Sequence, residues 1–569
     1  MQNPRSIVCA ACALLLAACT SGPAATGPAP GTGAPIAVVE PARTLTIAMR
    51  DEPSALPFRA LTFGGGSPSA QGFLFHAGLA LADERGVPQP QLAADLPQLN
   101  TDSWQLLPDG RMQTTYHLRP GLVWHDGTPL TAGDFVLGWH VYSTPGFGAE
   151  DRPLTFMDGV TAPDDQTVVI HWKQSFPDAG ATLYERHGFA PLPQHILARP
   201  FAEQSSDSFA ANPWWTTAFV GLGPYRLVHW EPGAYIEGAA FEGYVFGRPH
   251  IDRVKLVWIS DANTAVTHLL SGTVDFATDD AIGFEQSLLL KREWGDQGGK
   301  LLLTPSQTQM MQAQFRPEYT LPALNDPRVR QAILTATDRQ AVVEGVLNGE
   351  PAVADTLVST QLEFYPALAQ VLTTYPYDPA HAGELMRAAG LTKDATGFYA
   401  DSSGAHFSPE LWAVAAAPSD KIAAIVTDSW RRAGIDATQR LITPAQFQDR
   451  ELNTTFRGYR LVAKQAQGDS AFTAFASSYI GTAANRWMGT NYGGYSNREF
   501  DRLTQLYQTS LDRAEHNQAG VAGMQLLSQE VPGFALYYSY RVSAEGAGLT
   551  GPRAGTQEAW NIHEWQWTR

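Results

Sequence analysis

The chain has 569 residues, of which 44% are hydrophobic, 11% aromatic and 17% charged, so it holds enough apolar material for about two to four folded domains. This composition excludes an intrinsically disordered chain and a collagen-like fibre. The formal net charge of −17 makes nucleic acid an unfavourable partner, because the average field of the protein repels phosphates.

The first residues have the pattern of an export signal. An apolar run over residues 7–18 follows the basic residue Arg5, and it is too short to cross a bilayer as a helix, which needs about 20 residues. Residues 16–19 (LAAC) resemble the bacterial lipobox, in which cleavage precedes a cysteine that then carries a lipid. We therefore expect residues 1–18 to be a signal peptide and Cys19 to be lipidated. The alternative is ordinary cleavage beside an unmodified Cys19.

All three cysteines of the chain lie in this N-terminal region. Cys9 and Cys12 fall in the part that cleavage discards, so the mature chain is expected to fold without a disulfide. Residues 19–42 follow, rich in Gly, Pro, Ala and Ser, and such a segment cannot bury a core. It is expected to be a flexible tether between the lipid anchor and the folded body.

Strand and helix patterns alternate from residue 44 onward. Polar and apolar residues alternate over residues 44–48 and 112–118, which predicts two strands buried on one face. Thr131 is placed to cap a helix that runs to residue 142, with Asp134 near the positive end of the helix dipole.

The second half of the chain continues this alternation. Residues 253–258 alternate like a strand and lead into a helix that stops at Gly272. Asp326, Asp338 and Asp378 each precede an amphipathic segment, and a proline follows two of them at the first helical position, where its missing N–H costs nothing. Strands that alternate with capped helices predict an α/β protein.

Five segments carry longer motifs. They are residues 116–134 (YHLRPGLVWHDGTPLTAGD), 223–227 (GPYRL), 326–349 (DPRVRQAILTATDRQAVVEGVLNG), 377–390 (YDPAHAGELMRAAG) and 491–503 (NYGGYSNREFDRL). Together and in this order they resemble the large extracytoplasmic solute-binding proteins of ABC importers, the dipeptide-, oligopeptide- and nickel-binding group known as family 5. The resemblance covers essentially the whole mature chain.

The resemblance implies a two-lobed α/β fold of the periplasmic-binding-protein type, with an extra subdomain, mixed sheets flanked by helices, and a hinge between the lobes. The expected segments after the tether are residues 43–84 (lobe I), 85–209 (extra subdomain), 210–300 (lobe I), 301–534 (lobe II) and 535–569 (the C-terminal return to lobe I). A ligand that contacts both lobes would shift the hinge toward its closed form.

The function implied by the resemblance is the capture of a peptide or similar small solute and its delivery to ABC permease subunits in the cytoplasmic membrane. The protein would be a monomer in the cell envelope, at the periplasmic or outer face of the membrane, held there through Cys19. No nucleic acid is expected as a partner.

Asp469 is the first candidate for ligand contact. In peptide-binding relatives, a strand with a Trp is followed by D-x-x-DP, and an aspartate of that motif pairs with the α-amine of the peptide. Residues 461–470 keep Asp469 but lack the first Asp, the Trp and the Pro. A carboxylate in a desolvated cleft binds an ammonium more strongly than it would in water. The alternative is an ordinary solvated Asp in a turn.

Five further residues are candidate ligand contacts. Arg316 and Lys464 would suit a ligand carboxylate, Arg316 because a guanidinium can bind it in a bidentate manner. Trp412, Trp487 and Tyr492 would pack against an extended ligand. A surface ion pair for Arg316 and plain core positions for the aromatic residues are the alternatives.

The residues His125 and Asp126 form an HDG motif that is expected to fix a corner of the chain rather than to act in catalysis or metal binding. The sequence holds no G-x-S-x-G, no S-x-x-K with its partners, and no HExxH or other paired metal-ligand spacing. We therefore expect no enzyme, no catalytic or metal-ligating residue and no cofactor.

Three alternatives for the function stay open. Relatives in the family also carry opines, metal chelates, haem or oligosaccharides, so the solute need not be a peptide. A surface lipoprotein hydrolase is the alternative from another class, because glycosidase carboxylates leave little local trace in a sequence. A receptor-like or chaperone role without transport is the third.

Overall fold

The computed structural model describes residues 43–568, apart from residues 60, 62–69, 85, 146, 148–152, 181–187, 295–297, 351–352, 417, 467–469 and 556. The predictions for the signal peptide, the tether, Cys19 and Asp469 therefore lie outside the described residues.

One ten-stranded mixed sheet runs through the protein. Its strands, in the order in which they lie across the sheet, are β16 (Thr438–Ile442), β15 (Glu410–Val414), β17 (Gly458–Gln465), β12 (Lys300–Ala313), β18 (Gly533–Glu545), β11 (Phe276–Ala277), β1 (Thr44–Met49), β10 (Arg253–Trp258), β9 (Tyr235–Ala240) and β8 (Tyr225–Glu231). β15 pairs in parallel with β16 and β17, and β1 pairs in parallel with β10 and β11, whereas the other pairs are antiparallel.

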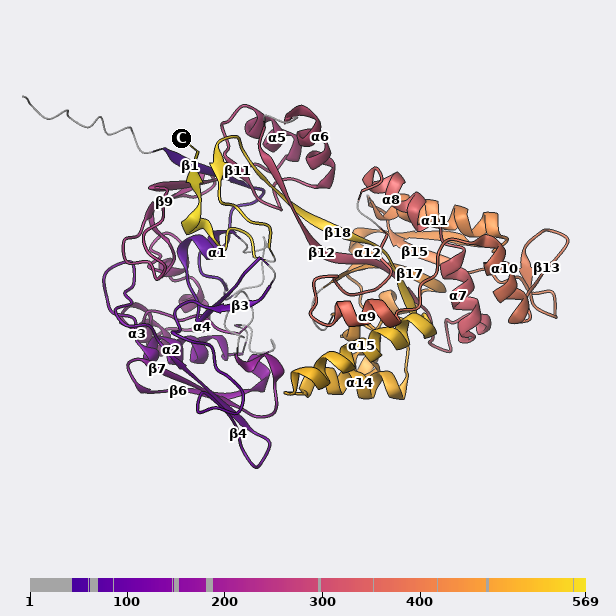
Figure 1. Cartoon of the computed structure of the whole chain (residues 1–569), viewed down its shortest axis with the longest axis horizontal. Helices are drawn as coiled ribbons and strands as arrows, with labels where there is room; N and C mark the ends of the chain where they lie inside the picture. Colours follow the sequence, from indigo (N-terminus) through magenta and orange to yellow (C-terminus); the bar gives the residue numbers. More distant parts are fainter. Residues whose placement is uncertain are drawn as a thin grey trace, which may run out of the picture. The chain divides into compact units, whose positions relative to one another are not determined.

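The two long central strands, β12 and β18, lie side by side along most of their length (Figure 1). Leu302 at one end of β12 belongs to a hydrophobic cluster built from β1, β10 and their neighbours. Met311 at the other end belongs to a separate cluster built from β15, β17 and the helices that cover them. We call the first part lobe I and the second part lobe II; β12 and β18 contribute to both.

Lobe I holds a second sheet of four antiparallel strands, in the order β4 (Trp104–Leu106), β5 (Met112–His117), β7 (Thr167–Trp172) and β6 (Met157–Asp164). Its helices are α1 (Ala70–Phe75), α2 (Ala132–Tyr142), α3 (Gln194–Glu203), α4 (Ser206–Ala210), α5 (Ala262–Leu270) and α6 (Phe284–Trp294). The small sheet and the lobe I end of the large sheet share one continuous hydrophobic cluster.

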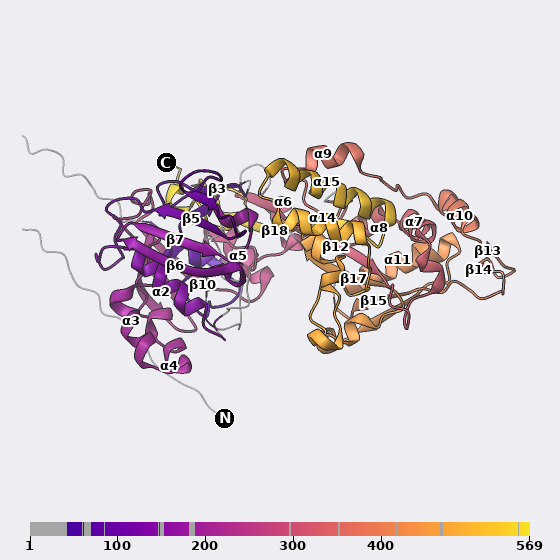
Figure 2. The ribbon, with the colours of Figure 1, turned by 90° about the horizontal axis from the view of Figure 1, so that it is seen from below.

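Lobe II covers both faces of its sheet with helices. They are α7 (Pro327–Thr335), α8 (Arg339–Leu347), α9 (Tyr365–Val371), α10 (Pro379–Ala388), α11 (Ser419–Ala433), α12 (Pro444–Phe447), α13 (Ser470–Thr473), α14 (Arg498–Thr509) and α15 (Arg513–Glu530). Figure 2 shows α14 and α15 side by side next to β12 and β17. Short two-stranded pairs complete the fold: β2 (Ala80–Ala82) with β3 (Pro88–Pro90), β13 (Thr392–Lys393) with β14 (Tyr399–Ala400), and β19 (Leu549–Thr550) with β20 (Gln566–Trp567).

The local predictions from the sequence are confirmed where the chain is described. The predicted strands form β1, β5 and β10. Asp326, Asp338 and Asp378 each accept a hydrogen bond from a backbone N–H in the first turn of α7, α8 and α10. Thr131 and Asp134 form a reciprocal capping box at the start of α2, which satisfies donors that a helix end leaves free. The predicted lobe boundaries inside the chain stay predictions.

Candidate functional site

Residues that alternate along the strands of lobe II point to opposite faces of the sheet. One set packs under α7, α8, α10 and α11, and consists of Leu411, Ala413, Tyr459, Leu461, Met311 and Ala313. The other set consists of Trp412, Arg460, Val462, Lys464, Met310 and Gln312. The second set contains two cations, Arg460 and Lys464, and apart from Gln312 its other members are apolar. We call its side of β16, β15, β17 and β12 the basic face.

Four residues form a row across the basic face. Arg440 on β16 pairs in register with Trp412 on β15, Trp412 pairs with Arg460 on β17, and Arg460 pairs with Gln312 on β12. Directly opposed residues on neighbouring strands have their side chains in contact range. Arg440 accordingly lies over the ring of Trp412, 4.3 Å from its centroid. The row therefore brings an exposed cation, an aromatic ring and a buried cation together.

Arg460 is the buried cation of this row, with 2% of its surface exposed. Its Nη1 donates to the carbonyl of Asn453 at 2.7 Å, and its guanidinium lies near the rings of Phe447 and Tyr492, 5.1 and 4.4 Å from their centroids. Its Nη2 has no hydrogen-bond partner among the described residues. Burial lowers the pKa of Arg460 to about 10, which leaves the side chain charged at neutral pH.

Lys464 follows on the same face of β17. Its Nζ lies 5.0 Å from the centroid of the Tyr492 ring, so Tyr492 contacts both cations of the strand. Burial, and then the charge of Arg460, lowers the pKa of Lys464 to about 8. No ion pair between described residues involves Lys464 or Arg460.

Arg316 positions the segment that carries Tyr492 and Trp487. Its Nε donates to the carbonyl of Tyr492 at 3.2 Å, and its Nη2 donates to the carbonyl of Gly481 at 2.8 Å. The guanidinium also lies 5.7 Å from the centroid of the Trp487 ring. Burial lowers the pKa of Arg316 from its ordinary value. The side chain thus clamps residues 481–492 through backbone carbonyls, and carboxylates are not its partners in the described chain.

Trp412 is buried, with 2% of its surface exposed, in a small cluster with Ile442 and Phe456, and Tyr492 packs against this cluster. Its indole N–H donates to Glu410 Oε2 at 2.7 Å. Trp412 therefore places Tyr492 next to the row of four residues on the basic face. Five residues predicted from the sequence, Arg316, Trp412, Lys464, Trp487 and Tyr492, lie in one contact network, whereas Asp469 lies outside the described residues.

Sequence reasoning missed Arg460 and Arg440. Arg460 stands two residues after the glycine that opens β17, in a strand whose other residues are largely apolar. A charged residue at a period-two position of a buried strand was the available signal, because charges are almost never fully buried without a partner. Arg440 became recognisable only when the parallel pairing of β15 with β16 placed it beside Trp412.

The HDG motif forms a corner, as expected. Gly127 has a positive φ of 88°, and Asp126 Oδ1 accepts the backbone N–H of Thr128 at 3.0 Å. His125 Nδ1 accepts the backbone N–H of Gly221 at 3.1 Å, so its Nε2 carries the proton toward the carbonyl of Gly223 at 3.0 Å. These bonds use the polar groups of the motif to join two loops.

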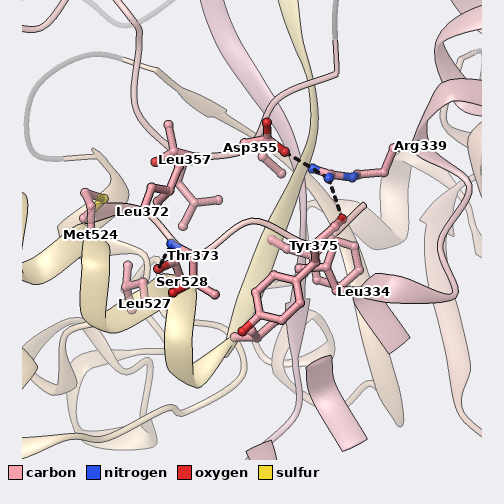
Figure 3. Close-up of a pocket in the computed structure, with 15 residues that line it drawn as sticks. Leu334, Arg339, Asp355, Leu357, Leu372, Thr373, Tyr375, Met524, Leu527 and Ser528 are labelled. Atoms are coloured by element: carbon pink, nitrogen blue, oxygen red, sulfur yellow. Dashed lines mark hydrogen bonds and ion pairs between the residues drawn. The ribbon is translucent and has the colours of Figure 1, made fainter. Parts of the chain in front are cut away.

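Two hollows lie elsewhere. The first is within lobe II, encloses about 440 Å³ of empty space, part of it open to solvent, and has Arg339 on its wall. Figure 3 shows Arg339 directed at Asp355 and at the carbonyl of Tyr375, each 3.0 Å away. The second lies beside β12 and β18 and contains Glu558 and Asp279. The predicted ligand residues line neither hollow.

The described part of the chain contains no group of three or more His, Cys, Asp or Glu side chains arranged to hold a metal ion. None of its described helices is both long and apolar enough to cross a bilayer.

Comparison with known proteins gives a consistent match. The model of the bacterial extracellular solute-binding proteins, family 5 (middle), matches residues 95–485. The chain is 25% identical over 469 residues to the oligopeptide-binding protein AppA of Bacillus subtilis, covering 80% of this chain and 81% of AppA. It is 27% identical over 462 residues to the glutathione-binding protein GsiB of Escherichia coli K12, covering 79% of this chain and 82% of GsiB.

Solved structures show the same two-lobed fold. AppA of Bacillus subtilis in complex with a nonapeptide superposes with a TM-score of 0.64 and 21% identity, covering 93% of this chain and 99% of that one. NikZ of Campylobacter jejuni in complex with Ni(L-His) superposes with a TM-score of 0.67 and 23% identity, covering 93% of this chain and 100% of that one.

Proposed function

This chain belongs to the bacterial extracellular solute-binding proteins of family 5, the substrate-binding components of ABC importers, and from that premise we propose that it captures a peptide or a peptide-like solute and delivers it to a membrane permease. Two relatives support the peptide class, since AppA is named for oligopeptides and GsiB for glutathione. No enzymatic step is part of the proposal.

The observation that carries the proposal is the convergence of predicted ligand residues. Arg316, Trp412, Lys464 and the pair Trp487 and Tyr492 come from four segments of the chain, yet each residue contacts another member or packs against Tyr492. Aromatic rings beside cations suit a ligand with a carboxylate and apolar side chains. Asp469 remains a proposed partner for an α-amine.

Binding without chemical change can be tested with native mass spectrometry of the protein purified from its own host. We expect a peptide-sized ligand that is released unaltered on denaturation, and calorimetry with the synthetic compound to reproduce binding to the emptied protein. An unaltered opine, metal chelate, haem or oligosaccharide would replace the peptide class. Conversion of the added compound into products would contradict a pure binding role and favour a hydrolase.

The cellular location forms part of the same proposal. We propose that the protein is a monomer in the cell envelope, tethered through lipid on Cys19, because residues 16–19 resemble a lipobox and the acyl chains on such a cysteine provide the two or more lipid anchors that stable attachment takes. Cys19→Ser is expected to move the protein from the membrane fraction to the soluble fraction of lysed cells. Membrane association that survives this change would refute the lipid anchor.

A further inference from the structure

We propose that the basic face of lobe II selects acidic solutes by binding a ligand carboxylate between Arg460 and Lys464, beside Tyr492. The inference rests on the proposed capture of a peptide-like solute and names the class of peptide: one with a free carboxylate that reaches these two side chains.

The state of Arg460 is the first argument. An almost fully buried guanidinium needs partners for its donors, because an unpaired buried charge is costly. Nη1 has the carbonyl of Asn453, whereas Nη2 has no partner among the described residues, and no described carboxylate pairs with the side chain. The ring of Tyr492 at 4.4 Å offsets part of the charge but accepts no directed hydrogen bond. A ligand carboxylate supplies the missing acceptor.

The position of Lys464 is the second argument. Residues 460 and 464 point to the same face of β17, and both cations lie within 5.0 Å of the centre of the same ring. The pKa of Lys464 is lowered first by burial and then by the charge of Arg460, so the two like charges repel each other. An anion between them removes this repulsion.

An arginine that only braced the fold would behave differently. Gln312 stands opposite Arg460 on β12, and its Oε1 has no hydrogen-bond partner in the described part of the chain. If Arg460 only stabilised the fold through a contact with Gln312, replacing Arg460 would lower the melting temperature and leave the preference among ligands unchanged. Selection among ligands is therefore the decisive readout.

The test is retention of peptides by the full-length mature chain after removal of bound ligand. Two synthetic libraries of two to five residues serve as probes: Ala/Glu peptides with a free C-terminus and matched Ala/Gln peptides with a C-terminal amide. Native mass spectrometry reads which peptides remain bound. We expect the acidic library to be retained at least tenfold better by the wild-type protein.

Three variants separate the possible causes. Arg460→Gln and Lys464→Gln are each expected to abolish the tenfold preference. Arg457→Gln, which removes the same charge from an exposed residue just before β17, is expected to keep it. If Arg460→Gln does not fold, Lys464→Gln decides alone, since the side chain of Lys464 makes no hydrogen bond or ion pair with the described residues.

The remaining outcomes are distinct. Equal retention of both libraries by the wild-type protein, or an unchanged preference in Lys464→Gln, would overturn the carboxylate site while peptide capture stands. Retention of neither library would overturn the peptide class of the proposed function, and the carboxylate site with it.

Discussion

In the proposed carboxylate site, Lys464 makes ligand binding sensitive to pH. Its pKa near 8 means that about nine-tenths of the side chain is protonated at pH 7 and about one-tenth at pH 9. Among the described residues, the groups that face it are Arg460, which stays charged over this range with a pKa of about 10, and the ring of Tyr492. A bound carboxylate stabilises the protonated form, so affinity is present below pH 8 and is lost as the pH rises through that value.

We therefore expect the dissociation constant of an acidic peptide, measured by calorimetry, to rise by up to about tenfold between pH 7 and pH 9. In Lys464→Gln the same titration should be nearly flat. A wild-type constant that does not change between these pH values would contradict a protonated Lys464 in the site.

The surroundings of Arg460 show why part of the candidate site could not be predicted from the sequence. Lys464, Tyr492 and Trp412 could be proposed from the sequence because the motifs around them resemble those of a known family. Arg460 was not, because its meaning depends on what surrounds it: the same residue in a solvated loop would be unremarkable. Burial beside Phe447 and Tyr492 is a property of tertiary packing and cannot be read from the neighbours of Arg460 in the chain.

At the scale of elements, α2 depends on a close approach to a neighbouring segment. A Cβ added at Gly138 would stand 2.0 Å from the carbonyl oxygen of Ala190, which is backbone and cannot move aside independently. A Cβ at Gly133 on the same helix would instead meet the amide of Gln194, also at 2.0 Å, which is the mobile end of a side chain. The two glycines form a matched pair.

Gly138→Ala is accordingly expected to destabilise the protein by about 1–3 kcal/mol, because the overpacking exceeds the gain in helix propensity. Gly133→Ala should change stability by less than about 0.5 kcal/mol, or raise it slightly. Urea denaturation followed by circular dichroism measures both. A similar loss of stability in the two variants would show that α2 does not pack against the backbone at Ala190 as described.

Helix starts were predictable because their causes are local. The capping aspartates Asp326, Asp338 and Asp378 bond to donors within three residues of themselves, so a short window of sequence contains both partners. The order of the strands in the ten-stranded sheet cannot be read from any short stretch of sequence. β12 pairs with β17 and β18, whose residues follow more than 140 positions later, and nothing in the strand itself selects those partners.

At the scale of the whole molecule, β12 and β18 are the strands common to both lobes. On β12, Leu302 belongs to a lobe I cluster and Met311 to a lobe II cluster. On β18, Leu536 belongs to the same lobe II cluster, and Val542 belongs to a cluster with Ala48 of β1 and Ala277 of β11. Between these ends the pairing slips in register twice, next to Pro305 and between Gln309 and Met310. Bulges bend and twist a strand locally, and proline lacks the N–H that would donate a hydrogen bond to the neighbouring strand. This stretch is therefore expected to bend more easily than the rest of the two strands.

A hinge at these bulges predicts that a bound ligand changes the compactness of the protein. A ligand alters the balance between open and closed forms only through contacts that differ between them, so a solute held by lobe II must also touch lobe I to have this effect. Small-angle X-ray scattering should then show a smaller radius of gyration when an acidic peptide is present at saturation. Arg457→Gln should contract in the same way, whereas Lys464→Gln should contract only at higher peptide concentration. An unchanged radius of gyration at saturation proven by calorimetry would mean that the two lobes do not move about β12 and β18 when the ligand binds.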